Sequence, residues 1–142
     1  MPIGRRNSSA TVTGTTTTLP QVRTDPAVAY GVGQAVALVP NPVTGAPTLM
    51  PCGASSYGQH FYGFLAAPAV PGLAPVVIVG RGSLVTPIVE NAVLLDPDQP
   101  VWLATTPGQV TQGCPTSGWA LQVGLAISTT QMVLVTDTRI AQ

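Results

Sequence analysis

The stretch Gln34-Ala35-Val36-Ala37-Leu38 recurs 65 residues later as Gln99-Pro100-Val101-Trp102-Leu103. Each copy is followed, in the same order, by a Pro/Gly turn, a cysteine, an aromatic residue, a glycine and a run of Val, Ile, Leu or Met. The offset is 65 residues at the Gln, 62 at the Cys, 61 at the Gly and 56 at the last run, as short loop deletions would produce. We therefore predict two similar β-units, residues 25–82 and 83–140, packed as one pseudo-symmetric body. The alternative is a chance similarity in a Val-, Gly- and Pro-rich sequence.

The composition is that of an all-β protein. Fifteen Gly and fifteen Pro in 142 residues interrupt the chain too often for long helices. The abundant Val and Thr favour strands, and many short strands with regularly spaced turns indicate a β-barrel or sandwich. The expected strands are 27–30, 35–39, 47–50, 61–66, 75–79, 84–88, 92–95, 101–104, 109–112, 120–126 and 132–136.

Residues 1–24 are expected to form an extended N-terminal arm ahead of the β domain, residues 25–142. The threonine-rich run 11–18 is β-prone but has almost nothing to bury, so we predict that it is ordered only where it lies on a neighbouring molecule. The alternative is a flexible tail. The candidate interface residues, in the arm and then in the body, are Arg5, Arg6, Val12, Leu19, Val22, Arg23, Tyr57 and His60.

Charge is unusually scarce in this sequence. Charged residues make up 7% of the chain, with five Lys or Arg, five Asp or Glu and a formal net charge of zero. A folded monomer of this size exposes roughly 7,000 Å², which leaves about one charge per 700 Å². We therefore expect other subunits to cover much of the surface. The alternative is a neutral surface of Thr, Ser, Gln and Gly.

The same charge pattern argues against nucleic acid as a partner. Arg5 and Arg6 are the only adjacent cations, whereas phosphate binding needs clustered positive charge. The chain has no apolar run of 18 residues, so no membrane-spanning helix is expected. The first residues carry basic side chains without an apolar stretch behind them, so we expect no signal peptide and synthesis in a cytoplasm.

We expect no enzyme activity, no small-molecule substrate and no cofactor or metal. The only histidine, His60, stands among aromatics, and no G-x-S-x-G motif surrounds a serine. Asp96 and Asp98 flank a proline in what reads as an ordinary turn, because the other oxygens of a calcium loop are missing. Cys52 and Cys114 lack the further ligands of a zinc site. We predict that both are reduced and structural, since a cytoplasmic origin favours free thiols.

Three segments of the second unit resemble a pattern in small β-rich accessory proteins of bacteriophage virions, written "G-x-P-V-Y-L-S … G-x-V-T … V-G-x-A". The resemblance covers about residues 30–136, and its short motifs specify a β-turn-β skeleton rather than a site. This chain departs from the pattern with Asp98 where the family usually has Gly and with Trp102 in place of Tyr. The matching segments are Gln99-Pro100-Val101-Trp102-Leu103, Pro107-Gly108-Gln109-Val110-Thr111 and Leu121-Gln122-Val123-Gly124-Leu125-Ala126.

The resemblance implies a structural virion protein, namely a capsid decoration or cement protein. Such a protein is a homotrimer seated on the outside of the shell, with the major capsid protein and copies of itself as partners. The alternative is a head-fibre or tail component with a host- or glycan-binding surface. That alternative predicts an exposed aromatic residue in a groove, drawn from Tyr57, Phe61, Tyr62 and Trp119.

Overall fold

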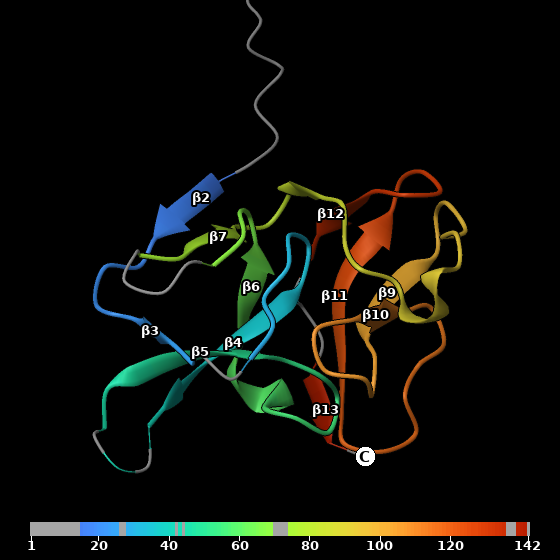
Figure 1. Cartoon of the computed structure of the whole chain (residues 1–142). Helices are drawn as coiled ribbons and strands as arrows, with labels where there is room; N and C mark the ends of the chain where they lie inside the picture. Colours follow the sequence, from blue (N-terminus) through green and yellow to red (C-terminus); the bar gives the residue numbers. More distant parts are fainter. Residues whose placement is uncertain are drawn as a thin grey trace, which may run out of the picture.

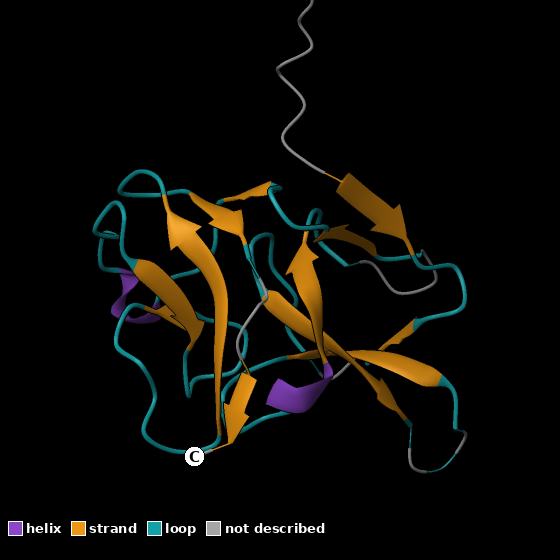
Figure 2. Ribbon diagram, turned by 180° about the vertical axis from the view of Figure 1, so that it is seen from behind, coloured by secondary structure: helices purple, strands orange, loops and turns teal. Residues whose placement is uncertain are grey.

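The computed structural model describes residues 15–25, 28–41, 43, 45–69 and 74–135, together with the backbone of residues 139–141. Two curled β-sheets, each shaped like half a barrel, lie side by side and are joined mainly by loops (Figures 1 and 2). Within the described ranges, helix is limited to two single 3₁₀ turns, η2 (Gly58–His60) and η3 (Glu90–Ala92). The expected all-β fold is confirmed.

The first sheet has six strands in the spatial order β2-β7-β6-β4-β5-β3. Neighbouring strands are antiparallel, except that β3 pairs with β5 in parallel. Successive side chains of a strand point to opposite faces, and both faces of this sheet carry apolar residues. The strands are β2 (Thr15–Thr18), β3 (Arg23–Thr24), β4 (Ala35–Pro40), β5 (Pro47–Pro51), β6 (Phe61–Leu65) and β7 (Val76–Val79).

The second sheet has the order β10-β9-β11-β12-β8 and is antiparallel throughout. Its longest strand, β11, also pairs through its first residues with a sixth strand, β13. The strands are β8 (Leu84–Val85), β9 (Pro100–Leu103), β10 (Val110–Thr111), β11 (Trp119–Ala126), β12 (Met132–Leu134) and β13 (Arg139–Ala141).

The two sheets repeat one strand order. Read across the sheets, β2-β7-β6-β4-β5 corresponds to β8-β12-β11-β9-β10, with the same antiparallel pairing at every step. Even β3 has a counterpart, because Val89 forms an isolated parallel bridge with Val110 of β10 at the position where β3 pairs with β5. The prediction of two similar β-units is therefore confirmed by the topology.

A shared irregularity strengthens the match between the sheets. Both β6 and β11 skip one residue in their pairing with β4 and β9, directly before a glycine. That glycine is Gly63, opposite Val36, in the first sheet and Gly124, opposite Val101, in the second. Because a β-bulge bends its strand and increases the local twist, both sheets curl at the same place.

The pairing moves the start of the first unit back from residue 25 to residue 15. Strand β2 forms the sheet edge beside β7 of its own chain, as β8 does beside β12 in the second unit. The expectation that residues up to 24 form an arm is therefore corrected for residues 15–24. The threonines of β2 form their backbone hydrogen bonds with β7 of the same chain. This pairing avoids the loss of translational and rotational entropy that association with another molecule would cost. Residues 1–14 lie outside the described residues.

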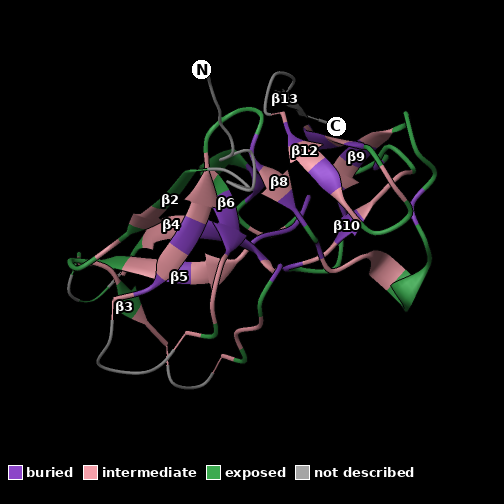
Figure 3. Ribbon diagram, turned by 90° about the horizontal axis from the view of Figure 1, so that it is seen from above, coloured by how far each residue is buried: buried purple, intermediate pink, exposed green. Residues whose placement is uncertain are grey.

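The core is shared by the two sheets but is unevenly distributed between them (Figure 3). A large cluster joins the interior of the second sheet to one face of the first. A small cluster lies on the opposite face of the first sheet. The large cluster contains Ala35, Ala37, Cys52, Phe64, Val85, Leu95, Val101, Leu103, Val110, Leu121, Val123, Ala126, Met132 and Leu134, and the small one contains Val36, Leu49, Leu65 and Val77.

Two expected strands are absent and at least two are shortened, among them 109–112, which is reduced to β10 (Val110–Thr111). Residues 28–30 and 92–95 form no strand. The strand expected at 84–88 is reduced to β8, and Val89, just beyond it, forms only an isolated bridge. Val93 and Leu94 are instead 58% and 69% exposed. Asn91 and Ala92 before them have positive φ angles of 61° and 55°, which end any extended run. A β-prone sequence without a neighbouring strand does not form a ladder.

Candidate functional site

The structure separates the candidate contact residues near the N-terminus. Leu19 and Val22 are partly buried and pack against the small core cluster, so part of each side chain contributes to the first unit's own fold. Arg23 is exposed at the start of the edge strand β3. The remaining three, Arg5, Arg6 and Val12, lie outside the described residues.

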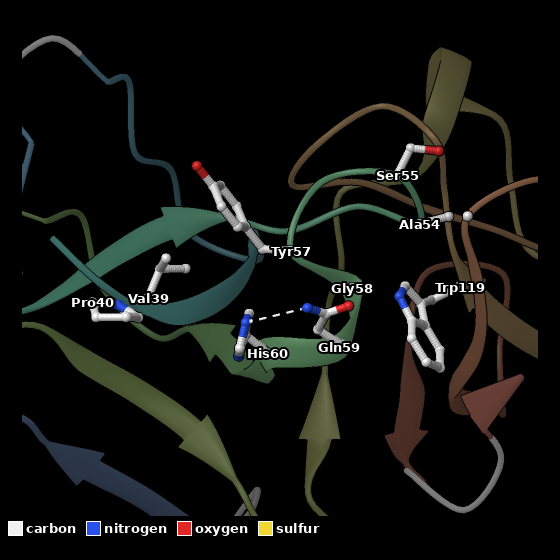
Figure 4. Close-up of a pocket in the computed structure, with 10 residues that line it drawn as sticks. Val39, Pro40, Ala54, Ser55, Tyr57, Gly58, Gln59, His60 and Trp119 are labelled. Carbon is white, nitrogen blue, oxygen red and sulfur yellow. Dashed lines mark hydrogen bonds between the residues drawn. The ribbon is translucent and has the colours of Figure 1, made fainter. Parts of the chain in front are cut away.

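The other two candidates, Tyr57 and His60, line one groove together with Trp119 (Figure 4). The cavity has a volume of about 510 Å³ and lies where the end of β4, the turn η2 and the start of β11 meet. Both units therefore contribute to it. Its lining residues are Val39, Pro40, Ala54, Ser55, Tyr57, Gly58, Gln59, His60, Gly118 and Trp119.

Tyr57 has a strained backbone. Its φ and ψ angles, 62° and 25°, lie in the left-handed region, which costs a bulky residue about 1 kcal/mol or more. Two hydrogen bonds hold its carbonyl oxygen, one from the Cys52 thiol at 3.3 Å and one from the His60 backbone N–H at 2.8 Å. The strain does not place the ring in the core, because Tyr57 is 43% exposed.

Close backbone approaches join the two units beside Tyr57. The Trp119 N–H donates to the Ala54 carbonyl oxygen at 2.6 Å, which ties β11 to the loop after β5. A side chain at Gly58 would lie 3.0 Å from the Trp119 Cβ, so glycine lets the tryptophan pack directly over η2. These contacts fix the wall of the groove on rigid elements.

The groove offers neutral chemistry only. No Asp, Glu, Lys or Arg is among its lining residues. The hydrogen-bonding groups are the Ser55 and Tyr57 hydroxyls, the Gln59 amide, the His60 imidazole and the Trp119 indole. Gln59 Nε2 and His60 Nε2 lie 3.5 Å apart, and both side chains are exposed. Without an acid to orient it, His60 lacks the partner that a catalytic triad requires.

A second surface feature lies on the outer face of the second sheet. Leu84, Pro100, Leu125 and Val133 are direct cross-strand neighbours on β8, β9, β11 and β12, and we call them the outer row. All four are partly exposed. They alternate along their strands with core residues, so they face away from the large cluster.

The corresponding row of the first sheet has a different environment. There Ala35, Phe64 and Ile78 are the cross-strand neighbours on β4, β6 and β7. Ala35 and Phe64 have 0% exposure and belong to the same cluster as the interior of the second sheet. The first unit thus buries the middle of this row within the chain, while Ile78 is partly buried and the edge position, Thr16, is exposed. The second unit leaves all four positions of its outer row partly exposed.

The described residues contain no group of three or more His, Cys, Asp or Glu side chains placed to hold a metal ion. In the same part of the chain, no helix has the length and apolar character needed to cross a bilayer. Cys52 and Cys114 are both in the thiol form, the first buried and the second exposed. The strand register shows that they are not equivalent, because Cys52 lies two residues after Met50 while Cys114 lies three after its counterpart Thr111.

Comparisons with protein-family models, with curated proteins and with solved structures find no match for this chain. The functional interpretation therefore depends on its own residues. Sequence reasoning named Tyr57, His60 and Trp119 but did not bring Gln59 or the outer row into the candidate set. The signal for the outer row was present, since β11 and β12 carry apolar residues at both alternating positions.

Proposed function

We propose that this protein is a structural virion protein of a bacteriophage, a decoration or cement protein that binds the outside of the capsid and stabilises it by bridging subunits. The observation that supports the proposal is the partly exposed outer row on the second sheet of a nearly uncharged body. In this proposal the major capsid protein and further copies of the chain, assembled as a homotrimer, are the partners. The role is one of binding, without catalysis.

Surface charge is the first support. The chain exposes 7153 Å² and has ten charged side chains, five positive and five negative, or about one per 700 Å². Soluble surfaces ordinarily have a quarter to a third of their residues charged. A neutral surface with an apolar row is suited to contact with other protein rather than with water.

The sequence pattern is the second support. The segments that resemble phage accessory proteins fall on β9, β10 and β11, the strands that carry much of the second sheet. A protein that binds only an assembled shell stabilises that assembly by mass action. Arg5, Arg6 and Val12 are proposed to contact the shell, while Leu19 and Val22 are assigned to the fold.

The first experiment asks where the protein resides. Density-gradient-purified phage particles from cells that encode the chain are analysed by mass spectrometry, and we expect the protein in fixed stoichiometry to the major capsid protein. Purified chain is then added to particles that lack it, and bound copies are counted by gel densitometry. A stable, highly soluble monomer that is absent from the particles and does not bind them would contradict the proposal.

Variants connect the binding to the surface. Leu125→Glu places a carboxylate in the outer row and should weaken particle binding about tenfold or more, because the charge would be desolvated at an apolar contact. Leu94→Glu is the matched control, since Leu94 is also an exposed leucine but lies outside the row. A chain beginning at residue 15 tests the arm separately while retaining β2. Equal binding by both Glu variants would exclude the outer row as the contact.

A further inference from the structure

The two units provide an internal reference for the groove around Tyr57. Gly63 and Gly124 occupy equivalent bulge positions, and counting back six residues from each reaches Tyr57 and Gly118. Both residues have left-handed backbones, with φ angles of 62° and 76°. A positive φ is thus adopted once by a tyrosine, before the turn η2, and once by a glycine, before the strand β11, and both residues line the groove.

Only one of these positions requires glycine for reasons of space. A Cβ at Gly118 would collide with the carbonyl oxygen of Ala54. Glycine adopts the left-handed conformation without steric cost, whereas Tyr57 adopts it under strain and still leaves its ring 43% exposed. Strained backbone conformations cluster at ligand clamps and active sites, which directs attention to the groove that Tyr57 lines.

The lining chemistry selects the class of ligand. In Figure 4 Tyr57 and Trp119 lie on two sides of the groove and Gln59 lies between them, while the Tyr57 ring extends away from Gln59 and His60. The polar groups are neutral donors and acceptors, and no lining residue is acidic or basic. A ligand that matches this surface has an apolar face, a rim of hydroxyl groups and no charge.

We propose that the groove binds a neutral oligosaccharide, with one pyranose ring stacked on Tyr57 and hydroxyl groups of a neighbouring ring hydrogen-bonded by Gln59 and His60. The volume of about 510 Å³ lies within the usual range of ligand sites, roughly 300–1,000 Å³. A sugar ring stacked on an exposed tyrosine contacts the apolar ring face, and the tyrosine hydroxyl can hydrogen-bond a sugar hydroxyl. This inference goes beyond the proposed capsid role and does not depend on it.

The test uses the full chain on an array of neutral, sialylated and sulfated glycans, followed by isothermal titration with the best neutral oligosaccharide. Tyr57→Gly is the decisive variant, because it retains the left-handed backbone and removes the ring. We expect it to lose tenfold or more in affinity with little change in melting temperature, since relief of strain offsets the added freedom of glycine. Gln59→Ala, at an exposed position, should weaken binding several-fold.

Tyr62→Ala is the matched control, because Tyr62 is 37% exposed on β6 but lies outside the groove. It should bind like the unmodified chain. Binding of sialylated or sulfated glycans alone would overturn the inference, as would affinity unchanged by Tyr57→Gly and Gln59→Ala or the absence of neutral-glycan binding. Particle binding by Tyr57→Gly is measured in parallel, so that failure of the carbohydrate site is distinguished from failure of the capsid role.

Discussion

The first unit, residues 15–82, and the second unit, residues 83–135, have the same strand order and the same bulge but opposite outer environments. At one register position the first unit has Phe64, which is fully buried, and the second has Leu125, which is partly exposed. Repeating a β-unit within one chain therefore does not make the two copies equivalent. The middle of one outer row is covered inside the molecule, whereas the other row stays partly exposed along its length.

The strongest test of this comparison truncates the two matched positions. Phe64→Ala removes the largest fully buried side chain of the described residues and should lower the free energy of unfolding by about 4 kcal/mol. Leu125→Ala should cost about 1 kcal/mol in the isolated chain, because less of its surface leaves water on folding. Urea denaturation followed by circular dichroism measures both. Similar losses at the two positions would show that their environments do not differ in solution.

The next test addresses the bulge glycines. A Cβ at Gly63 would collide with the carbonyl oxygen of Ile78, and one at Gly124 would lie 2.7 Å from that of Val133 and 2.5 Å from a methionine sulfur. Gly63→Ala should therefore cost about 3 kcal/mol and Gly124→Ala about 2 kcal/mol, because the new Cβ approaches a backbone carbonyl oxygen more closely at Gly63, whereas the nearest atom at Gly124 belongs to a flexible methionine.

Gly113→Ala is the control for both glycine variants. A Cβ added at Gly113 would meet no atom within 4 Å, and the residue is exposed. Its unfolding midpoint should stay close to that of the unmodified chain. If all three alanines had the same effect, close packing at the bulge would not explain the glycines.

Much of this architecture was readable from residue patterns. The recurrence of Q-x-V-x-L, with its shrinking offset, correctly indicated two similar β-units. The strand pairing changes the last offset from 56 to 55, because Phe64 is opposite Ile78 in the first sheet and its counterpart Leu125 is opposite Val133 in the second. Local pattern suffices where a strand's own residues are apolar at alternating positions.

The errors arose where a strand depends on a distant partner. The threonines of β2 have no hydrophobic pattern, and their pairing with β7 comes from residues about 60 positions away. Val93 and Leu94 have strand propensity but no neighbouring strand. The sequence predicted aromatic residues for a groove but not where the groove lies. Its position depends on the contact between Trp119 and Gly58, which is set by the packing of the two units. Such long-range choices are not encoded in local propensity.

The smallest expected change in stability concerns the residues that cover the two core clusters, Leu95 in the second unit and Tyr30 in the first. Leu95, which is apolar and 1% exposed, helps to enclose the second unit, whereas Tyr30 packs against the smaller cluster of the first. The Tyr30 hydroxyl donates to the Leu49 carbonyl oxygen and accepts from the Asp25 N–H at 3.0 Å. Tyr30→Phe should lower the free energy of unfolding by about 1 kcal/mol at neutral pH, because it removes these hydrogen bonds.

This loss should depend on pH. Burial raises the pKa of Tyr30 above its ordinary value of 10.0; the Asp25 backbone hydrogen bond opposes the shift, and the Asp25 charge adds to it. Because the folded pKa exceeds the unfolded one, the stability due to the neutral phenol is complete below about pH 10 and declines as the pH rises through the folded pKa. The difference in urea midpoint between the unmodified chain and Tyr30→Phe should therefore narrow from pH 7 to pH 11. A constant difference would mean that the Tyr30 hydroxyl contributes no proton-linked stability to the first unit. Leu95→Ala is the apolar comparison in the second unit, and the difference in urea midpoint that it causes should not change between pH 7 and pH 11.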